Sequence, residues 1–289
     1  MAPLLLDLLS DHTDPAREVA RWKAQQQVAL ALCRIYAESD HCGRAYCDGD
    51  PPERIQGVKR GWQAVITADA ELQAVSAREL LDRFMQETIF WRQIEIGKAL
   101  AAKGDRSVVS ALEARLADPD RHRRGNAAYV LGRLGDPRGF DTVERILSDR
   151  SDRPPGQGIP GGRWTVAAQI RADRYYAAHL LGDLQDPRGV ERLVPLMNDP
   201  DVRSVVPWSL AQIGDTRAIP PLLQALAQDD PSMRVLAISA LETLHAREAL
   251  PRLRELLQDH RPSNFGTQTT VAEAARHAIA VLAPDRRPF

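Results

Sequence analysis

The sequence predicts an all-α protein, built as a solenoid in which short helices pack in pairs. Three observations predict this fold. One turn motif recurs along the 289 residues, and helical spacing of apolar residues appears on both sides of each turn. Ala, Leu and Arg dominate the composition, while aromatic residues are only 5% of it, and Ala and Leu favour helix.

The recurring turn follows a helix and starts the next one. Its equivalent residues are Asp105, Asp136, Asp186, Asp215 and Ala246, which are spaced 31, 50, 29 and 31 residues apart. The spacing of 50 contains one ordinary step and an insertion of about 19 residues. A period near 30 with helical patterns on both sides of the turn is typical of a solenoid.

The segment Asp199–Asp229, DPDVRSVVPWSLAQIGDTRAIPPLLQALAQD, shows one complete unit. Gly214 is expected to end one helical stretch, and Asp215 to begin the turn and cap the helix that follows. Neither stretch can bury its apolar stripe alone, so each must pack on its neighbours. The stripes are Val202, Val206, Leu210 and Ile213, and then Ile219, Leu222, Leu223 and Leu226.

Pro207 is expected to lie well inside the helical stretch that ends at Gly214. An interior proline costs about 3 kcal/mol and frees the carbonyl four residues earlier, here that of Arg203. The interpretation is a kink beside Trp208, either harmless or a strained feature of a site.

The pattern DP-x-x-R-x-x-AA-x-x-LG-x-LGDPR extends from Phe90 to Val281, about two thirds of the chain. It resembles HEAT-like repeats of the phycobilin-lyase type. The resemblance implies a right-handed superhelical α-solenoid of about five to six helical hairpins. It does not define an activity, because such repeats serve many unrelated functions.

The domain organisation follows the repeat. We expect an N-terminal helical cap or divergent repeats over 1–75, the solenoid over 76–283, and a tail at 284–289. Insertions at 150–169 and 260–270 carry Trp164 and Phe265. Because both insertions fall at equivalent turns, they should rise from the same rim. Each aromatic residue either docks on its own repeat or helps to cover a groove.

HEAT-like stacks usually line their concave face with the second helix of each unit, the one that carries the Arg of DP-x-x-R. Either these arginines form an internal ladder with Asp residues of adjacent turns, or they bind a partner. Helical periodicity turns positions one, two, five and nine after each Arg outward. The Arg column is Arg124, Arg174, Arg203 and Arg234.

These outward positions are rich in aromatic residues, where a solvated helix would carry Lys and Glu. They predict a half-apolar groove, unless the rings simply pack between repeats. Candidate binding residues are Tyr129, Tyr175, Tyr176, His179, Trp208, Trp164, Arg124 and Arg174.

Two classes of function remain open. The first is a non-enzymatic scaffold that grips a protein or peptide segment in the groove. The alternative is a small-molecule enzyme or chaperone, lyase-, cyclase- or isomerase-like, with a ligand pocket under the insertion loops. An enzyme would use His179 and Asp183, one turn apart, together with Tyr176 and Tyr129.

Charge and cysteine content exclude other classes. Lys and Arg number 38 against 39 acidic residues, so nucleic-acid binding is disfavoured. Residues 121–174 nevertheless hold eleven Arg against six acidic residues, which favours an anionic ligand as an alternative. The three cysteines and the absence of a long apolar run predict a cytoplasmic protein outside the membrane. His41, Cys42 and Cys47 lack a recurring zinc-site spacing, so we expect no metal and no cofactor.

Overall fold

The computed structural model describes residues 72–87, 90–151, 166–263 and 269–283. These residues are helical apart from turns and one isolated bridge between Pro262 and Thr270, which confirms the all-α prediction for them. The chain divides into two compact units, Met1–Val109 and Ser110–Phe289. The boundary expected near residue 75 stays a prediction.

The described part of the first unit is a helical hairpin. It consists of α4 (Ala77–Gln86), α5 (Phe90–Lys103) and the 3₁₀ turn η1 (Arg106–Val108). The Ser76 hydroxyl caps α4 by accepting a hydrogen bond from the Glu79 amide at 3.2 Å. Leu80 and Phe84 are fully buried, and the hairpin is tied by a hydrogen bond from Gln93 Nε2 to the Phe84 carbonyl at 3.0 Å.

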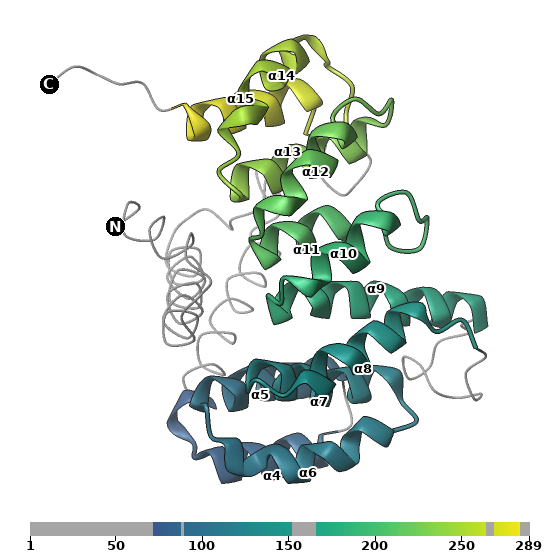
Figure 1. The fold of residues 1–289 in the computed structure, drawn as a ribbon, viewed down its shortest axis with the longest axis vertical. Coiled ribbons are helices and arrows are strands. Elements are labelled where there is room, and N and C mark those ends of the chain that lie inside the picture. The colour runs from purple at the N-terminus through teal and green to yellow at the C-terminus, as the bar shows by residue number, and fades with distance from the viewer. Residues whose placement is uncertain (1–71, 88–89, 152–165, 264–268, 284–289) are drawn as a thin grey trace, which may run out of the picture. The chain divides into compact units, whose positions relative to one another are not determined.

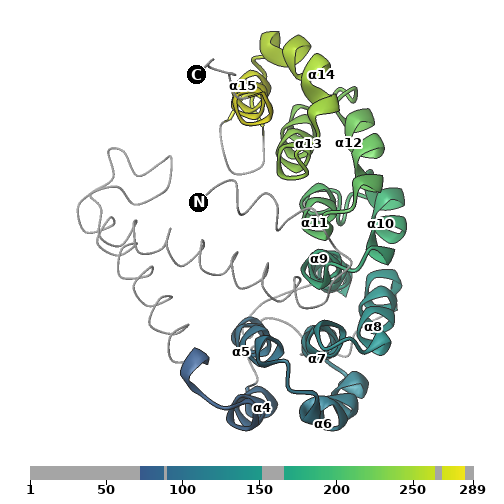
Figure 2. The same cartoon turned by 60° about the vertical axis from the view of Figure 1, so that its left-hand side comes forward.

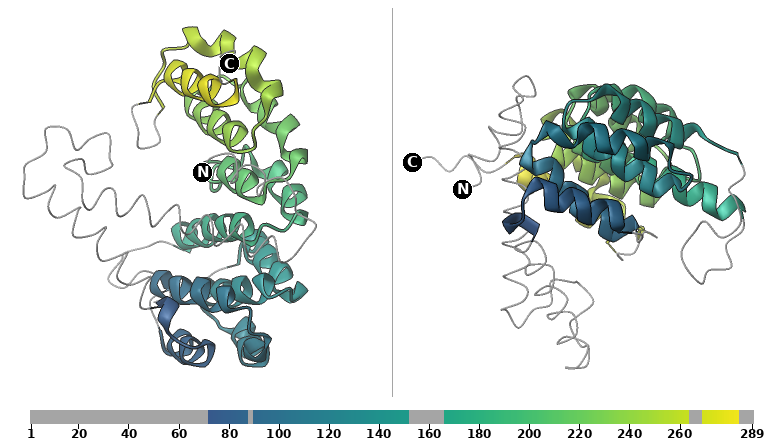
Figure 3. Two further views of the ribbon diagram at one scale, coloured as in Figure 1. Left: turned by 90° about the vertical axis from the view of Figure 1, so that its left-hand side faces the viewer. Right: turned by 90° about the horizontal axis from the view of Figure 1, so that it is seen from below.

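The second unit is a two-layer helical stack, shown in Figures 1 and 2 and from two further directions in Figure 3. Each second helix packs on the second helix of the next repeat. In Figure 2 the second helices lie on the concave side of this unit's arc, and the first helices lie on its convex side. This arrangement is an α-solenoid. The second helices are α7 (Arg121–Arg133), α9 (Val166–Leu184), α11 (Val206–Ile213), α13 (Pro231–Thr243) and α15 (Val271–Leu282).

The first helices are shorter, and several continue as 3₁₀ turns. The predicted stripes hold the two layers together: Leu222 of α12, Val206 and Leu210 of α11, and Val202 in the turn before α11 are all 0% exposed. The first helices are α6 (Val109–Glu113) with η2 (Ala114–Ala117), α8 (Pro137–Ser148), α10 (Arg188–Leu193) with η3 (Val194–Leu196), η4 (Thr216–Ala218) with α12 (Ile219–Ala225), and η5 (Arg247–Ala249) with α14 (Leu250–Glu255) and η6 (Leu256–Gln258).

The repeated turn has the same backbone conformation in every repeat. The residue before each aligned position adopts a positive φ, between 52° and 79°. Four of the aligned positions are aspartates, and each accepts a hydrogen bond from the amide two residues later, whereas Ala246 provides no side-chain cap. The left-handed residues are Gly104, Gly135, Gln185, Gly214 and His245.

The prediction that Pro207 lies well inside its helix is wrong. α11 begins at Val206, so Pro207 occupies its first turn, and residues 200–205 form turns instead of helix. The proline ring would clash with the Arg203 carbonyl in a continuous helix, and a first-turn proline removes an amide that needs no helical partner. The backbone therefore starts the α-helix at the proline and is not kinked by it.

The insertion expected at 150–169 is shorter on its C-terminal side, because α9 already begins at Val166. Trp164, Phe265, and the cysteine-containing loop with His41, Cys42 and Cys47 lie outside the described residues. The predictions that rest on those residues therefore stay predictions.

Candidate binding site on the second helices

The Arg column forms a ladder in three of its four positions. Arg174 pairs with Asp199 and with Asp201 at 2.5 Å each, and its Nε donates to the Leu147 carbonyl at 3.1 Å. Its side chain is only 1% exposed, so this guanidinium holds two repeats together and has no free face for a partner. The candidate binding role of Arg174 is thereby replaced by a structural one.

The next two ladder positions follow the same pattern. Arg203 Nη1 lies 3.0 Å from Asp230, and Arg234 Nη1 lies 2.5 Å from Asp259. Arg203 lies in the turn before α11 and Arg234 lies on α13, and each pairs with an acid 25 to 27 residues later, in the next repeat. The ladder is therefore a repeat-to-repeat connection, as one of the two interpretations of the Arg column predicted.

Arg124 is the exception to this ladder. The equivalent carboxylate, Asp149, pairs with Arg121 at 2.7 Å instead. Arg124 Nη1 donates to the Asp118 carbonyl oxygen at 3.2 Å, and Arg124 belongs to no ion pair among the described residues. Arg121 stands at the repeat position that Pro200 and Pro231 occupy later in the chain. Arg121 at that position takes the acid, whereas Arg171, at the same position on α9, pairs with Asp201 and leaves Asp199 to Arg174.

The outward-facing prediction holds for positions one, five and nine on α9, α11 and α13. None of these nine residues is buried, and Gln212, Ser239 and Thr243 among them have hydrogen-bonding side chains. The full set is Tyr175, His179 and Asp183, then Ser204, Trp208 and Gln212, and then Val235, Ser239 and Thr243. This set of exposed and partly exposed residues is called the inner face below.

Two helices contribute an aromatic cluster to the inner face. The His179 and Trp208 rings lie with centroids 4.1 Å apart and an interplanar angle of 32°. One helical turn before His179, Tyr175 is 42% exposed. One turn after it, Asp183 Oδ2 lies 3.3 Å from His179 Nδ1. The sequence prediction that Asp183 can orient the imidazole is consistent with this geometry.

The same prediction is wrong for positions one and five of α7, Gly125 and Tyr129, whereas Arg133 at position nine is not buried. Tyr129 is 1% exposed and Asn126 is 0% exposed, so neither faces solvent. The physical reason is packing on several sides, because α7 contacts α8, α9 and η2 and is buried over most of its circumference. Tyr129 is therefore a core residue of the second unit.

Position two is directed into the stack for Asn126, Tyr176 and Val205, whereas Leu236, at this position on α13, is not buried. The Tyr176 hydroxyl donates to Asn126 Oδ1 at 2.5 Å, and the Tyr176 ring lies 5.0 Å from that of His122. Val205, at the same position on the third of these repeats, is 3% exposed. Tyr176 thus joins α9 to α7 and does not meet His179, although both were candidates for one active site.

Sequence reasoning missed a buried polar cluster between α7 and α9. Asp173, whose side chain is 0% exposed, lies 3.2 Å from Arg121 Nη1 and 3.4 Å from His122 Nδ1. Arg121 Nη2 also donates to Ser151 Oγ at 2.6 Å. The only sequence signal was Asp173 itself, an acid one residue before the ladder Arg174 and therefore on a buried side of its helix.

Within the described ranges, no group of three or more His, Cys, Asp or Glu side chains is arranged to hold a metal ion. None of the helices in those ranges has the length and apolar character needed to cross a bilayer.

With this geometry in place, comparisons with known proteins identify the family. A family model described as HEAT repeats matches residues 73–154, 168–235 and 219–279. The chain therefore belongs to the HEAT repeat family. A comparison with curated protein sequences finds no match.

Solved structures give a further comparison. The chain is similar to one in the complex of CpcE and CpcF of phycocyanin lyase from Nostoc sp. PCC7120. The two are 24% identical with a TM-score of 0.43, over 61% of this chain and 65% of that one. The match thus spans slightly less than two thirds of that chain's length.

Proposed function

We propose that this protein is a binding module that holds a protein or peptide segment on the inner face of its second helices. The observation that carries the proposal is the aromatic cluster of Tyr175, which is exposed, and His179 and Trp208, which are partly exposed, shared by two neighbouring repeats. A HEAT repeat solenoid supplies the rigid support, because each repeat is fixed by its neighbours.

The side chains of the inner face are of the kind that contact a partner, and not of the kind that usually face solvent. Aromatic residues are only 5% of the chain, yet two of them and a histidine gather at this one place. Large amphipathic rings bordered by small polar residues are typical of interface anchors and their rims. Trp208 and Tyr175 bury much apolar area on binding and lose little conformational entropy. They are therefore the expected anchors.

The test begins with native mass spectrometry of the protein isolated gently from its own host. The expected result is a retained polypeptide whose mass identifies a partner. Binding of that purified partner is then measured for the wild type, Trp208→Ala and Tyr175→Ala. Each variant should weaken affinity by about tenfold or more, the loss typical of an interface anchor.

Val281→Ala is the matched control, because Val281 is an apolar side chain of α15, 41% exposed and outside the aromatic cluster. Its affinity should equal that of the wild type. Unchanged affinity in both aromatic variants, with circular dichroism showing a native fold, would contradict the proposal.

A second candidate function is small-molecule handling, favoured by one observation. His179 and Asp183 form a pair at 3.3 Å on a half-exposed surface, the arrangement of a general base and its orienting carboxylate. This function requires a retained small mass in the same spectrum. It also requires loss of conversion of that molecule in both His179→Ala and Asp183→Ala. Full turnover in both variants would eliminate it.

A further inference from the structure

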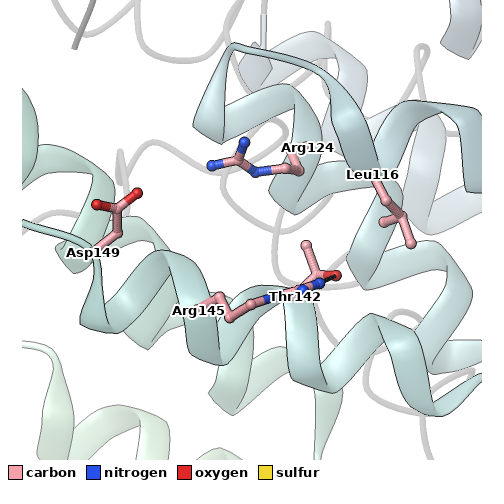
Figure 4. Close-up of a pocket in the computed structure, with 5 residues that line it drawn as sticks. All are labelled: Leu116, Arg124, Thr142, Arg145 and Asp149. Carbon is pink, nitrogen blue, oxygen red and sulfur yellow. Dashed lines mark hydrogen bonds between the residues drawn. The ribbon is translucent and has the colours of Figure 1, made fainter. Parts of the chain in front are cut away.

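The first repeat of the second unit contains a pocket of about 290 Å³, separate from the aromatic cluster (Figure 4). The guanidinium of Arg124, from the first turn of α7, projects into it. Arg145, from the last turn of α8, lies on the opposite wall beside Thr142. Leu116 and Asp149 complete the described lining.

The charge of Arg124 is poorly compensated. The other three ladder arginines have carboxylate partners within 3.0 Å, whereas the acid equivalent for Arg124 pairs with Arg121. Burial first, and then the positive charge of Arg121, lower the pKa of the Arg124 guanidinium from its ordinary value, and the charges of Asp149 and Asp173 offset this only in part. A half-buried cation in this position is stabilised by any anion that reaches it.

The second arginine of the pocket is similarly placed. Arg145 Nη2 donates to Thr142 Oγ1 at 2.9 Å, and among the described residues Arg145 makes no ion pair. The charge of Arg145 further opposes that of Arg124, so the two cations are close enough to repel each other. Two guanidinium groups on separate helices thus face one cavity, which is the arrangement that oxyanions relieve.

One feature of the lining opposes an anion. Asp149 carries a carboxylate at the far side of the pocket, although its charge is partly compensated by Arg121 at 2.7 Å. A singly charged carboxylate ligand would gain little against it. A phosphate group carries close to two negative charges and three or more acceptor oxygens, enough to bond both arginines at once.

We infer that this pocket binds a phosphate group through Arg124 and Arg145, as inorganic phosphate or as the phosphate monoester of a small molecule. The inference does not rest on the proposed peptide binding, because the pocket shares no residue with the inner face. It adds a second, electrostatic site to a repeat whose second helix, α7, presents no aromatic cluster.

The experiment is titration calorimetry of the full chain with inorganic phosphate, phenyl phosphate and benzoate, at constant ionic strength set with sodium chloride. Saturable binding of at least one phosphate compound, at least tenfold tighter than benzoate, is the expected result. The tighter of the two phosphate compounds identifies the free ion or the monoester as the natural form. Equal binding of benzoate, or no saturable binding of either phosphate compound, would overturn the inference.

Three variants locate the site. Arg124→Gln and Arg145→Gln should each weaken phosphate binding about tenfold or more, the loss expected when one charge-assisted bond is removed. The control, Arg252→Gln on α14, removes an arginine side chain that is 39% exposed and belongs to a different repeat from the pocket lining, so its affinity should not change. Equal affinity in the wild type and both pocket variants would overturn the assignment.

Asp149→Asn provides a test that misfolding cannot imitate. Removing the carboxylate that faces the bound anion should tighten phosphate binding severalfold, because the repulsion disappears while both arginines remain. Weaker or unchanged phosphate binding in this variant, with a native circular dichroism spectrum, would count against the pocket.

Discussion

The imidazole of His179 stacks on the indole of Trp208, with ring centroids 4.1 Å apart. The two residues are 29 positions apart in sequence and occupy the same repeat position on α9 and α11. Their contact therefore both joins two repeats and forms the centre of the aromatic cluster on the inner face.

This stacking should be measurable as a coupling energy. In a double-mutant cycle of His179→Ala and Trp208→Ala, we expect the two changes to couple by about 0.5–1.5 kcal/mol in the free energy of unfolding, as aromatic pairs do. Urea denaturation provides the measurement. The control cycle pairs His179→Ala with Ser239→Ala on α13, and should be additive. Additivity in the His179–Trp208 cycle would show that the contact contributes nothing.

The loss of unfolding free energy on removing a ladder arginine should depend strongly on how buried its side chain is. Arg174→Met removes a side chain that is 1% exposed and leaves Asp199 and Asp201 only their longer ion pairs with exposed arginines, which should cost about 3–5 kcal/mol. Arg203→Met removes the equivalent side chain one repeat later, where it is 42% exposed, and should cost less than about 1 kcal/mol. Chemical denaturation of both variants makes the comparison. Similar losses would show that burial does not control how much each ladder arginine contributes to stability.

Acid should weaken the last repeat through Asp259. Hydrogen bonds from Arg261, and then from Arg234, hold the pKa of Asp259 far below its ordinary value. A depressed pKa in the folded state contributes stability that is complete above the unfolded pKa, about 4, and is lost as pH falls toward the folded value.

The measurement for Asp259 is the free energy of unfolding of the wild type and Asp259→Asn across pH. Their difference should be constant from about pH 6 to 8 and should shrink below about pH 4. Val281→Ala removes no titratable group, so its difference from the wild type should not change with pH. A constant difference for Asp259→Asn down to the lowest pH would contradict the assigned role.

The repeated turn offers a stabilising substitution. His245 has a φ of 52° and an exposed side chain, at a position where Gly135 and Gly214 stand in other repeats. His245→Gly should raise the free energy of unfolding by up to about 1 kcal/mol, because glycine adopts this conformation without steric cost.

Gln185→Gly is the matched comparison, since Gln185 has a φ of 57° in the equivalent turn. Its side chain accepts a hydrogen bond from Arg133 and donates one to the Gln212 carbonyl, each at 3.2 Å. Losing both should offset the relief of strain, at about 1 kcal/mol per hydrogen bond. Thermal unfolding measures both variants. An equal gain in both would show that the Gln185 side chain is dispensable.

Local sequence patterns predicted the helices and turns because the forces involved are themselves local. Asp136 and Asp215 were expected to begin turns, and each accepts the amide hydrogen bond of a cap. Gly214 was expected to end a helix, and it adopts a φ of 75°. The prediction for Pro207 is wrong because helical apolar spacing continues through this residue, while the proline's steric clash with the preceding turn moves the helix start to Val206.

By itself, the sequence determined the repeat period, the all-α solenoid and the outward positions of Tyr175, His179 and Trp208. These features depend on spacing within one helix or turn. Only the tertiary structure decided which arginine keeps a carboxylate. Arg121 pairs with Asp149, so Arg124 has no ion-pair partner among the described residues and lines the pocket instead. Only the tertiary structure buried Tyr129, because helices on several sides of α7 cover positions that are open on α9 and α11. Both outcomes depend on contacts between repeats, which the spacing within one repeat does not encode.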